Sequence, residues 1–79
     1  MKDDPIASGR VIKRSLVVAG HSTSVSLEEE FWMALKANAA ARALSVAALV
    51  ADIDRSRKGA NLSSSLRVYC LREAQKKAS

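Results

Sequence analysis

Residues 11–27 carry the hydrophobic pattern of β-structure. Val, Ile, Ser and Thr dominate this stretch, and good helix formers are scarce. The run SLVVAG is apolar, whereas the run HSTSVSL that follows it alternates in character. The alternation predicts a buried face made of Thr23, Val25 and Leu27. It leaves the opposite face to Ser22, Ser24 and Ser26. Gly20 between the two runs permits a turn or a bulge, so the pattern predicts either one bent strand or a hairpin.

The spacing becomes helical at Ser26. The run SLEE predicts a capping box, in which the Ser26 hydroxyl accepts from the N–H of Glu29 and the Glu29 side chain reaches back to the N–H of Ser26. Three glutamates at residues 28–30 also suit the positive end of a helix dipole. Phe31 and Leu35 follow at i, i+4 spacing. A first helix is therefore predicted directly after the strand region.

Two further helices follow in the sequence pattern. Ser45 is a good N-cap for a second helix over roughly Val46–Lys58, and Gly59 is suited to end it. Asn61 and the residues after it begin a third helix over roughly Ser64–Lys77. The predicted order is therefore strand, helix, helix and an added helix.

Composition narrows the classes of function. The 79 residues include one cysteine, Cys70, and one histidine, His21, which excludes an internal disulfide framework and an ordinary all-His/Cys zinc site. The sequence has no nucleophile–base pair, glycine-rich phosphate loop or metal-spaced cluster, so we predict no enzyme activity, no metal and no cofactor. No run is long and apolar enough to span a membrane, and residues 1–10 lack the apolar core of a signal peptide. We therefore expect a cytoplasmic protein without a membrane partner.

The net charge of +5 lies at the two ends of the chain. Residues 1–27 carry a net +2 and residues 61–79 a net +3, whereas residues 28–60 balance. A basic balance favours a polyanion partner, most often nucleic acid. Residues 1–12 are expected to form a flexible N-terminal arm, and residues 13–79 a single domain.

A short strand on its own leaves the hydrogen bonds of its edges unsatisfied, and a chain of this length buries only a small core. Both demands are met if two chains pair their strands about a two-fold axis over a shared layer of helices. We therefore predict a mainly α fold with one short β-ribbon, built as an intertwined homodimer whose antiparallel ribbon is intermolecular. The expected dimer core consists of eight apolar residues: Val25, Leu27, Phe31, Trp32, Leu35, Leu49, Val50 and Ile53.

The runs KRSLVVAGH, TSVSLEEEFW, IDRSR and NLSSSLRVYCLR, in this order, resemble the ribbon-helix-helix DNA-binding family. The closest likeness is to its bacterial subgroup of short chains with an extra C-terminal helix, and it covers roughly residues 13–72. The resemblance implies a homodimeric transcriptional regulator, such as a repressor, that inserts a two-stranded β-ribbon into the major groove of double-stranded DNA. The residues that it implies at the DNA are Lys13, Arg14, Ser22, Ser24, Ser26, Ser45 and Val46. The serines would meet base edges, the start of the second helix would bind phosphate, and the two basic residues would contact the DNA backbone.

The three serines depart from the long polar or basic side chains that this family usually presents, because Ser reads bases weakly. The alternative function is therefore an antitoxin-like protein-interaction module, in which the same dimer docks an acidic protein without sequence-specific DNA binding. Simpler interpretations also stand beside the functional ones. The serines can be a solvated strand face, and Lys13 and Arg14 can protect a strand edge. Cys70 can be a small buried hydrophobe, and Asp52 and Asp54 can bridge to nearby arginines.

Overall fold

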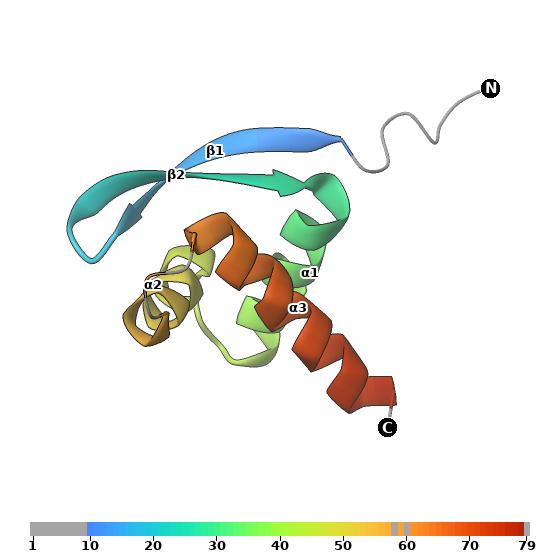
Figure 1. Cartoon of the computed structure of the whole chain (residues 1–79). Helices are drawn as coiled ribbons and strands as arrows, with labels where there is room; N and C mark the ends of the chain where they lie inside the picture. The colour runs from blue at the N-terminus through green and yellow to red at the C-terminus, as the bar shows by residue number, and fades with distance from the viewer. Residues whose placement is uncertain (1–9, 58, 60, 79) are drawn as a thin grey trace.

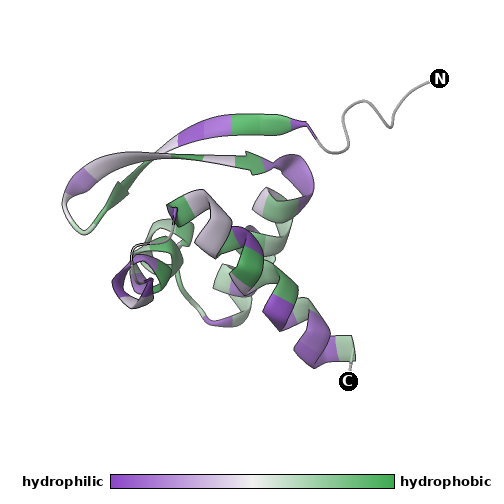
Figure 2. Ribbon diagram, viewed as in Figure 1, coloured by the Kyte–Doolittle hydropathy of each residue, from purple (hydrophilic) through white to green (hydrophobic). Residues whose placement is uncertain are grey.

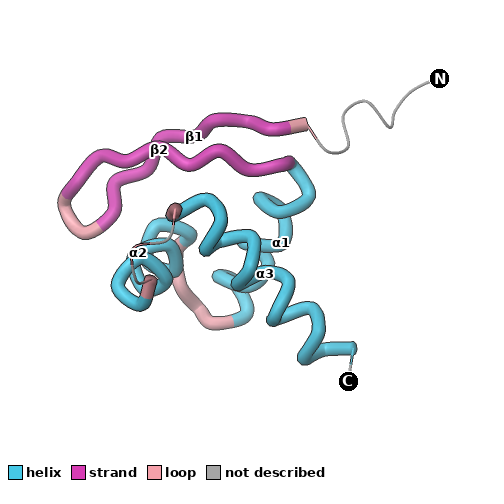
Figure 3. Tube along the Cα trace, viewed as in Figure 1, coloured by secondary structure: helices cyan, strands magenta, loops and turns pink. Residues whose placement is uncertain are grey.

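The computed structural model describes residues 10–57, 59 and 61–78, and it begins with two strands. The elements are β1 (Val11–Val18), β2 (His21–Glu28), α1 (Glu29–Ala41), α2 (Val46–Ser56) and α3 (Leu62–Ala78). The strands form a ribbon that lies along one side of the three helices (Figure 1 and Figure 3). The predicted order, a strand region followed by two helices and an added third helix, is confirmed.

Ala19 and Gly20 join the strands in a tight two-residue turn. Both residues have positive φ, 52° and 81°, as a type I′ turn requires, and the twist of this turn matches that of the flanking strands. The strands pair antiparallel along their whole length, with Val11 opposite Glu28 at the open end. Of the two predicted alternatives, the hairpin is therefore the correct one. In the single chain described here, β1 and β2 pair with each other, because the turn reverses the backbone in two residues.

The hairpin extends beyond the predicted domain boundary. Val11 and Ile12, which the sequence assigned to an arm over residues 1–12, belong to β1 and pair with the end of β2. The carbonyl of Arg10 accepts a hydrogen bond from the N–H of Glu29 at 3.1 Å. Backbone groups at the end of β2 need partners, and these residues supply them. Residues 1–9, the rest of the predicted arm, lie outside the described residues.

One face of the hairpin is buried against the helices. On β2, Val25 and Leu27 are buried, whereas Ser22 and Ser24 are exposed. The alternation read from the sequence is confirmed for these four residues, whereas Thr23 and Ser26 are both partly buried. β1 packs on α2, and β2 packs on α1 and α3. The opposite face of the hairpin is left to the solvent.

Residues from the hairpin and all three helices form a buried core within one chain. Six of the eight residues expected in a dimer core are buried: Val25, Leu27, Leu35, Leu49, Val50 and Ile53. Phe31 and Trp32 are partly buried and pack against this cluster. Leu66 and Cys70 of α3 are buried in the same cluster, so the third helix packs on the core of its own chain. Beyond its contact with the core, the C-terminal end of α3 is hydrophilic (Figure 2).

α1 begins at Glu29 without the predicted capping box. β2 continues through Glu28, whose side chain makes no cap hydrogen bond and instead pairs with Arg67. The N–H of Ser26, which the box assigned to Glu29, donates to Ser63 Oγ at 3.1 Å. Strand pairing and contacts with α3 therefore override the local capping signal, and this prediction was wrong.

Side chains cap the starts of the other two helices, as the sequence predicted for Ser45 but not for Asn61. Ser45 Oγ accepts from the N–H of Ala48 at 3.0 Å, and Asn61 Oδ1 accepts from the N–H of Ser64 at 3.2 Å. Such caps satisfy N–H groups that have no partner within the helix. The helix ends differ slightly from the prediction, since α2 stops before Lys58 and α3 starts before Ser64.

Candidate nucleic-acid interface

The solvent side of the β1–β2 hairpin, here called the hairpin face, combines polar residues of both strands with two valines of β1. Its members are Val11, Lys13, Ser15 and Val17 of β1, and Ser22, Ser24, Ser26 and Glu28 of β2. In the register, Lys13 lies opposite Ser26, and Ser15 lies opposite Ser24. The structure thus brings Lys13 onto one surface with the three serines that the sequence proposed for DNA contact.

The hairpin face has a shape and chemistry suited to a DNA groove. Neighbouring strands lie about 4.8 Å apart, and a major groove about 12 Å wide admits a two-stranded ribbon. The hydroxyl groups donate and accept hydrogen bonds, and Lys13 adds a cation. Val17 is 66% exposed and Val11 is 53% exposed, so apolar contact with a thymine methyl group is also within reach.

Arg14 lies on the opposite side of the hairpin from Lys13, contrary to its predicted phosphate contact. Neighbouring residues of a strand point to opposite faces. The guanidinium carbon of Arg14 lies 4.4 Å from the centroid of the Trp32 ring, and Arg14 Nη2 donates to Glu29 Oε1 at 2.9 Å. These cation–π and ion-pair contacts tie β1 to the start of α1. Arg14 therefore anchors the hairpin instead of extending the hairpin face.

Two residues of α3 clasp the end of β2. Arg67 Nε donates to Glu28 Oε1 at 2.8 Å, and Arg67 Nη2 donates to the carbonyl oxygen of Ser26 at 3.2 Å. The second is Ser63, whose hydroxyl accepts from the N–H of Ser26. The side-chain hydrogen bond from Arg67 lowers the pKa of Glu28 below its ordinary value. The clasp neutralises the carboxylate of the hairpin face and leaves Ser26 partly buried.

Neither clasp residue was predicted from the sequence. Both residues lie in the run NLSSSLRVYCLR, to which the sequence assigned the third helix but no contact with the strands. Each lies about forty residues along the chain from its partner, and no spacing rule connects positions so far apart. The pairs become visible only when α3 is seen packed against β2.

Ser45 and Val46 stand at the N-terminus of α2. Ser45 is exposed, and its hydroxyl is occupied as the acceptor for Ala48. Val46 is partly buried and packs against the core. N–H groups of a first helical turn keep the geometry that suits an anion. No hydrogen bond or ion pair between described residues joins Ser45 to the hairpin face, so a single chain presents two separate candidate surfaces.

The carboxylates of α2 are held in ion pairs. Asp52 Oδ2 lies 3.3 Å from Arg42 Nη2, and Asp54 pairs with Arg57. The interpretation that these aspartates bridge to arginines is confirmed. Arg42 also donates to the Tyr69 hydroxyl at 3.5 Å, and this hydrogen bond, together with the one to Asp52, raises the pKa of Arg42. Arg42 thereby connects the end of α1 with α2 and α3.

Cys70 is a buried thiol that packs with the core. Its Sγ lies 3.7 Å from the carbonyl oxygen of Phe31. Burial raises the pKa of the thiol, so it stays protonated at neutral pH. This agrees with its interpretation as a small buried hydrophobe.

Metal-binding clusters and membrane-spanning helices are both missing from residues 10–57, 59 and 61–78. This part of the chain brings no three His, Cys, Asp or Glu residues together in a way that could hold a metal ion. It also has no single helix long and apolar enough to span a membrane. α1 and α2 meet that length and composition only as a pair bent by 98°.

Comparisons with known proteins agree with the arrangement of strands and helices. The model of the ribbon-helix-helix domain family matches residues 11–74, a range that includes both strands and most of α3. Among solved structures, an uncharacterized protein from Bordetella pertussis Tohama I is 37% identical, with a TM-score of 0.77 over 92% of this chain. The chain spans 62% of the length of that protein chain. No curated protein matches.

Proposed function

We propose that this chain, which belongs to the ribbon-helix-helix family, binds double-stranded DNA through its hairpin face and acts as a transcriptional regulator. Domains of this family typically bind DNA. The observation that carries the proposal is the hairpin face itself, an exposed surface of hydroxyl groups and Lys13. The carboxylate on this face, that of Glu28, is paired with Arg67. Arg14 and Arg67 hold the ribbon on the helices, with the hairpin face turned outward.

Phosphate contacts supply most of the affinity in this proposal. Lys13 is an exposed cation of the hairpin face, and Arg10, also exposed, lies at the entrance to β1. The N-terminus of α2 at Ser45 and Val46 would add a phosphate contact through its backbone N–H groups. Such binding weakens steeply as the salt concentration rises, because phosphate contacts release counterions.

We propose that two chains form the DNA-binding unit by exchanging strands, since ribbon-helix-helix domains are typically homodimeric. Opening the hairpin at Ala19 and Gly20 lets β1 of each chain pair with β2 of the other in the same register. Each inward-facing residue then meets the same helix surfaces as in the closed hairpin. The left-handed conformation of Ala19, φ 52°, costs about 1 kcal/mol in a residue with a Cβ. The extended strand relieves this cost.

Light scattering tests the exchange through the turn. Ala19→Gly removes the conformational cost and should shift the protein toward the mass of one chain, 8.5 kDa. Ala19→Val worsens the turn, because a β-branched residue disfavours positive φ, and should shift the protein toward twice that mass. Identical masses for the two variants at matched concentrations would exclude exchange through this turn.

The serines of the hairpin face favour a second candidate, a protein-interaction module without sequence-specific DNA binding. Ser22 and Ser24 are the most accessible hydroxyls of β2, and a hydroxyl both donates and accepts, so it discriminates poorly between bases. The two candidates differ in one observable: only the regulator prefers some duplex sequences over others.

Fluorescence anisotropy with labelled duplexes, random and genomic, at two salt concentrations tests the DNA-binding proposal. Ser24→Glu places a carboxylate on the hairpin face and should abolish binding by repelling phosphates. Ala37→Glu is the matched control, because it adds the same charge at an exposed position of α1. Wild-type protein that fails to bind at low salt, or equal binding by the two variants, would overturn the proposal.

A further inference from the structure

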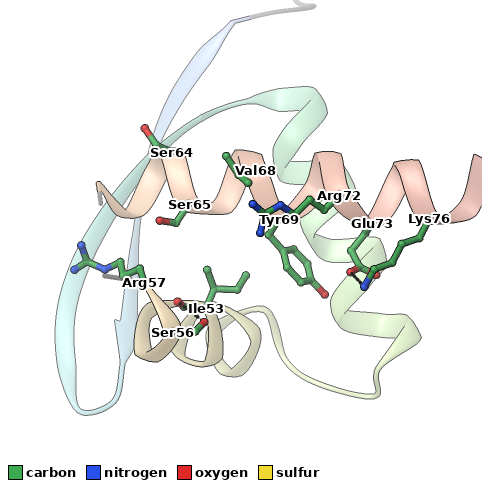
Figure 4. A pocket seen from close by; sticks show the side chains of 10 residues that line it. All are labelled: Ile53, Ser56, Arg57, Ser64, Ser65, Val68, Tyr69, Arg72, Glu73 and Lys76. Carbon is green, nitrogen blue, oxygen red and sulfur yellow. Dashed lines mark hydrogen bonds and ion pairs between the residues drawn. The ribbon is translucent and has the colours of Figure 1, made fainter. Parts of the chain in front are cut away.

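An open groove of about 500 Å³ lies between α2 and α3, and none of its lining residues belongs to the hairpin. Figure 4 shows its interior, where Ile53 and Ser56 of α2 face Ser65 and Tyr69 of α3. Val68, 44% exposed, also lines it. A concave surface of this kind, partly apolar and rimmed by polar groups, is typical of an interaction site.

Cations are distributed along the whole groove. Arg57 lies at one end, Lys76 at the other, and Arg72 between them (Figure 4). The lining carboxylate, Glu73, lies 3.0 Å from Lys76, and Arg57 pairs with Asp54. Arg72 makes no hydrogen bond or ion pair with any described residue. The groove therefore combines an apolar floor with a positive rim and a guanidinium group that is available to a ligand.

We propose that this surface, here called the α2–α3 groove, binds an acidic amphipathic segment of a partner protein. Apolar side chains of the segment would cover Ile53, Val68 and Tyr69, and one of its carboxylates would pair with Arg72. Residues 64–76 extend over about 18 Å at 1.5 Å per residue, which matches a helical segment of about three turns. A DNA backbone fits less well, because its charged phosphates would leave the apolar floor uncovered.

The groove and the hairpin face consist of different residues. A partner protein can therefore occupy the groove while the hairpin face remains open. The proposal does not depend on DNA binding, and a protein that never bound DNA would still present the groove.

A labelled peptide of about twelve residues, with Leu on one helical face and Glu on the other, is the probe for this groove. We expect fluorescence anisotropy to show binding that weakens with added salt. The same peptide with Gln in place of Glu should bind about tenfold more weakly, since it offers no carboxylate to Arg72. Absence of binding by the acidic peptide at about 1 mM, or equal affinity for both peptides, would overturn the proposal.

Arg72→Glu should lower the affinity for the acidic peptide about tenfold, because it replaces attraction by repulsion. Lys77→Glu is the matched control, since Lys77 is exposed on the same helix but does not line the groove, and its effect should stay within about twofold. Circular dichroism checks that both variants keep the wild-type helix content.

Two other occupants give distinct outcomes. If Arg72→Glu weakens duplex DNA binding as strongly as it weakens peptide binding, phosphate is the ligand of the groove and the proposal fails. If Arg72→Glu halves the mass measured by light scattering, a second copy of the chain covers the groove and the proposal also fails. The proposal predicts that the Arg72→Glu variant binds duplex DNA at least as tightly as the Lys77→Glu variant. It also predicts that Arg72→Glu leaves the mass measured by light scattering unchanged.

Discussion

The two faces of the hairpin share the same strands but differ in what they contact. The inward face holds Val25 and Leu27, which are buried, and Arg14, which is stacked on Trp32. The outward face holds Lys13 and the serines, which form no core. Lys13 and Arg14 are neighbours in sequence and carry the same charge, yet one is free for a polyanion and the other anchors the fold. A count of basic residues therefore overstates the charge that is available for binding.

The largest expected difference between the faces is in stability. Leu27→Ala should lower the free energy of unfolding by about 2–5 kcal/mol, because Leu27 is fully buried and its truncation leaves a cavity. Ser24→Ala on the outward face should change it by less than about 0.5 kcal/mol. Urea denaturation measures both values. Similar losses for the two variants would break the distinction between an inward and an outward face.

The neighbouring cations sharpen the same comparison. Arg14→Ala should lower the free energy of unfolding by about 1 kcal/mol, because it removes a partly exposed ion pair and a cation–π contact. Lys13→Ala removes neither and should have an effect near zero. Denaturation by urea again gives both values. Equal losses would show that Arg14 does not anchor β1.

The clasp at the end of β2 should appear as a pH dependence of stability. The pKa of Glu28 is lowered in the folded chain from its ordinary 4.5. The carboxylate therefore stabilises the fold above its ordinary pKa, and this contribution is lost as the pH falls through the folded value. Urea denaturation from neutral pH into that acid range should show a decrease that is smaller in Glu28→Gln. An identical pH profile for this variant would remove Glu28 from the clasp.

The last prediction concerns the reaction rate of the Cys70 thiol. Cys70 is buried, and its thiol pKa is raised, so it should react with a disulfide reagent far more slowly than the same thiol in denaturant. Absorbance of the released thiolate measures the two rates. Reaction at the denatured rate under native conditions would place Cys70 outside the core.

Local patterns predicted much of this fold. Alternation assigned the buried and exposed residues of β2, and Ser45 and Asn61 marked the starts of two helices through a short-range interaction. The capping box failed because β2 remains paired through Glu28, a constraint that comes from outside the SLEE run. Neighbouring residues of a strand point to opposite faces, and this places Lys13 and Arg14 on different sides of the hairpin. The rule can be applied only once β1 is known to be a strand that includes both residues.

Long-range packing accounts for what the sequence did not predict. The clasp of Arg67 on Glu28 and the α2–α3 groove depend on where α3 lies, and no spacing in the chain specifies that position. The completion of the core by Leu66 and Cys70 is of the same kind. The expectation of a second chain rested on a single strand and a small core. Within this one chain, the turn at Ala19 and Gly20 pairs two strands, and the third helix adds Leu66 and Cys70 to the core.

The salt dependence of DNA affinity in Lys13→Ala and Arg14→Ala tests most directly whether the hairpin face is the DNA-binding surface. Fluorescence anisotropy over a range of salt concentrations gives the slope of log affinity against log salt for each variant. Loss of one phosphate contact in Lys13→Ala should reduce the magnitude of that slope by about one, and Arg14→Ala should keep the wild-type slope. A reduced slope for Arg14→Ala together with a wild-type slope for Lys13→Ala would contradict the assignment of the outward face to DNA.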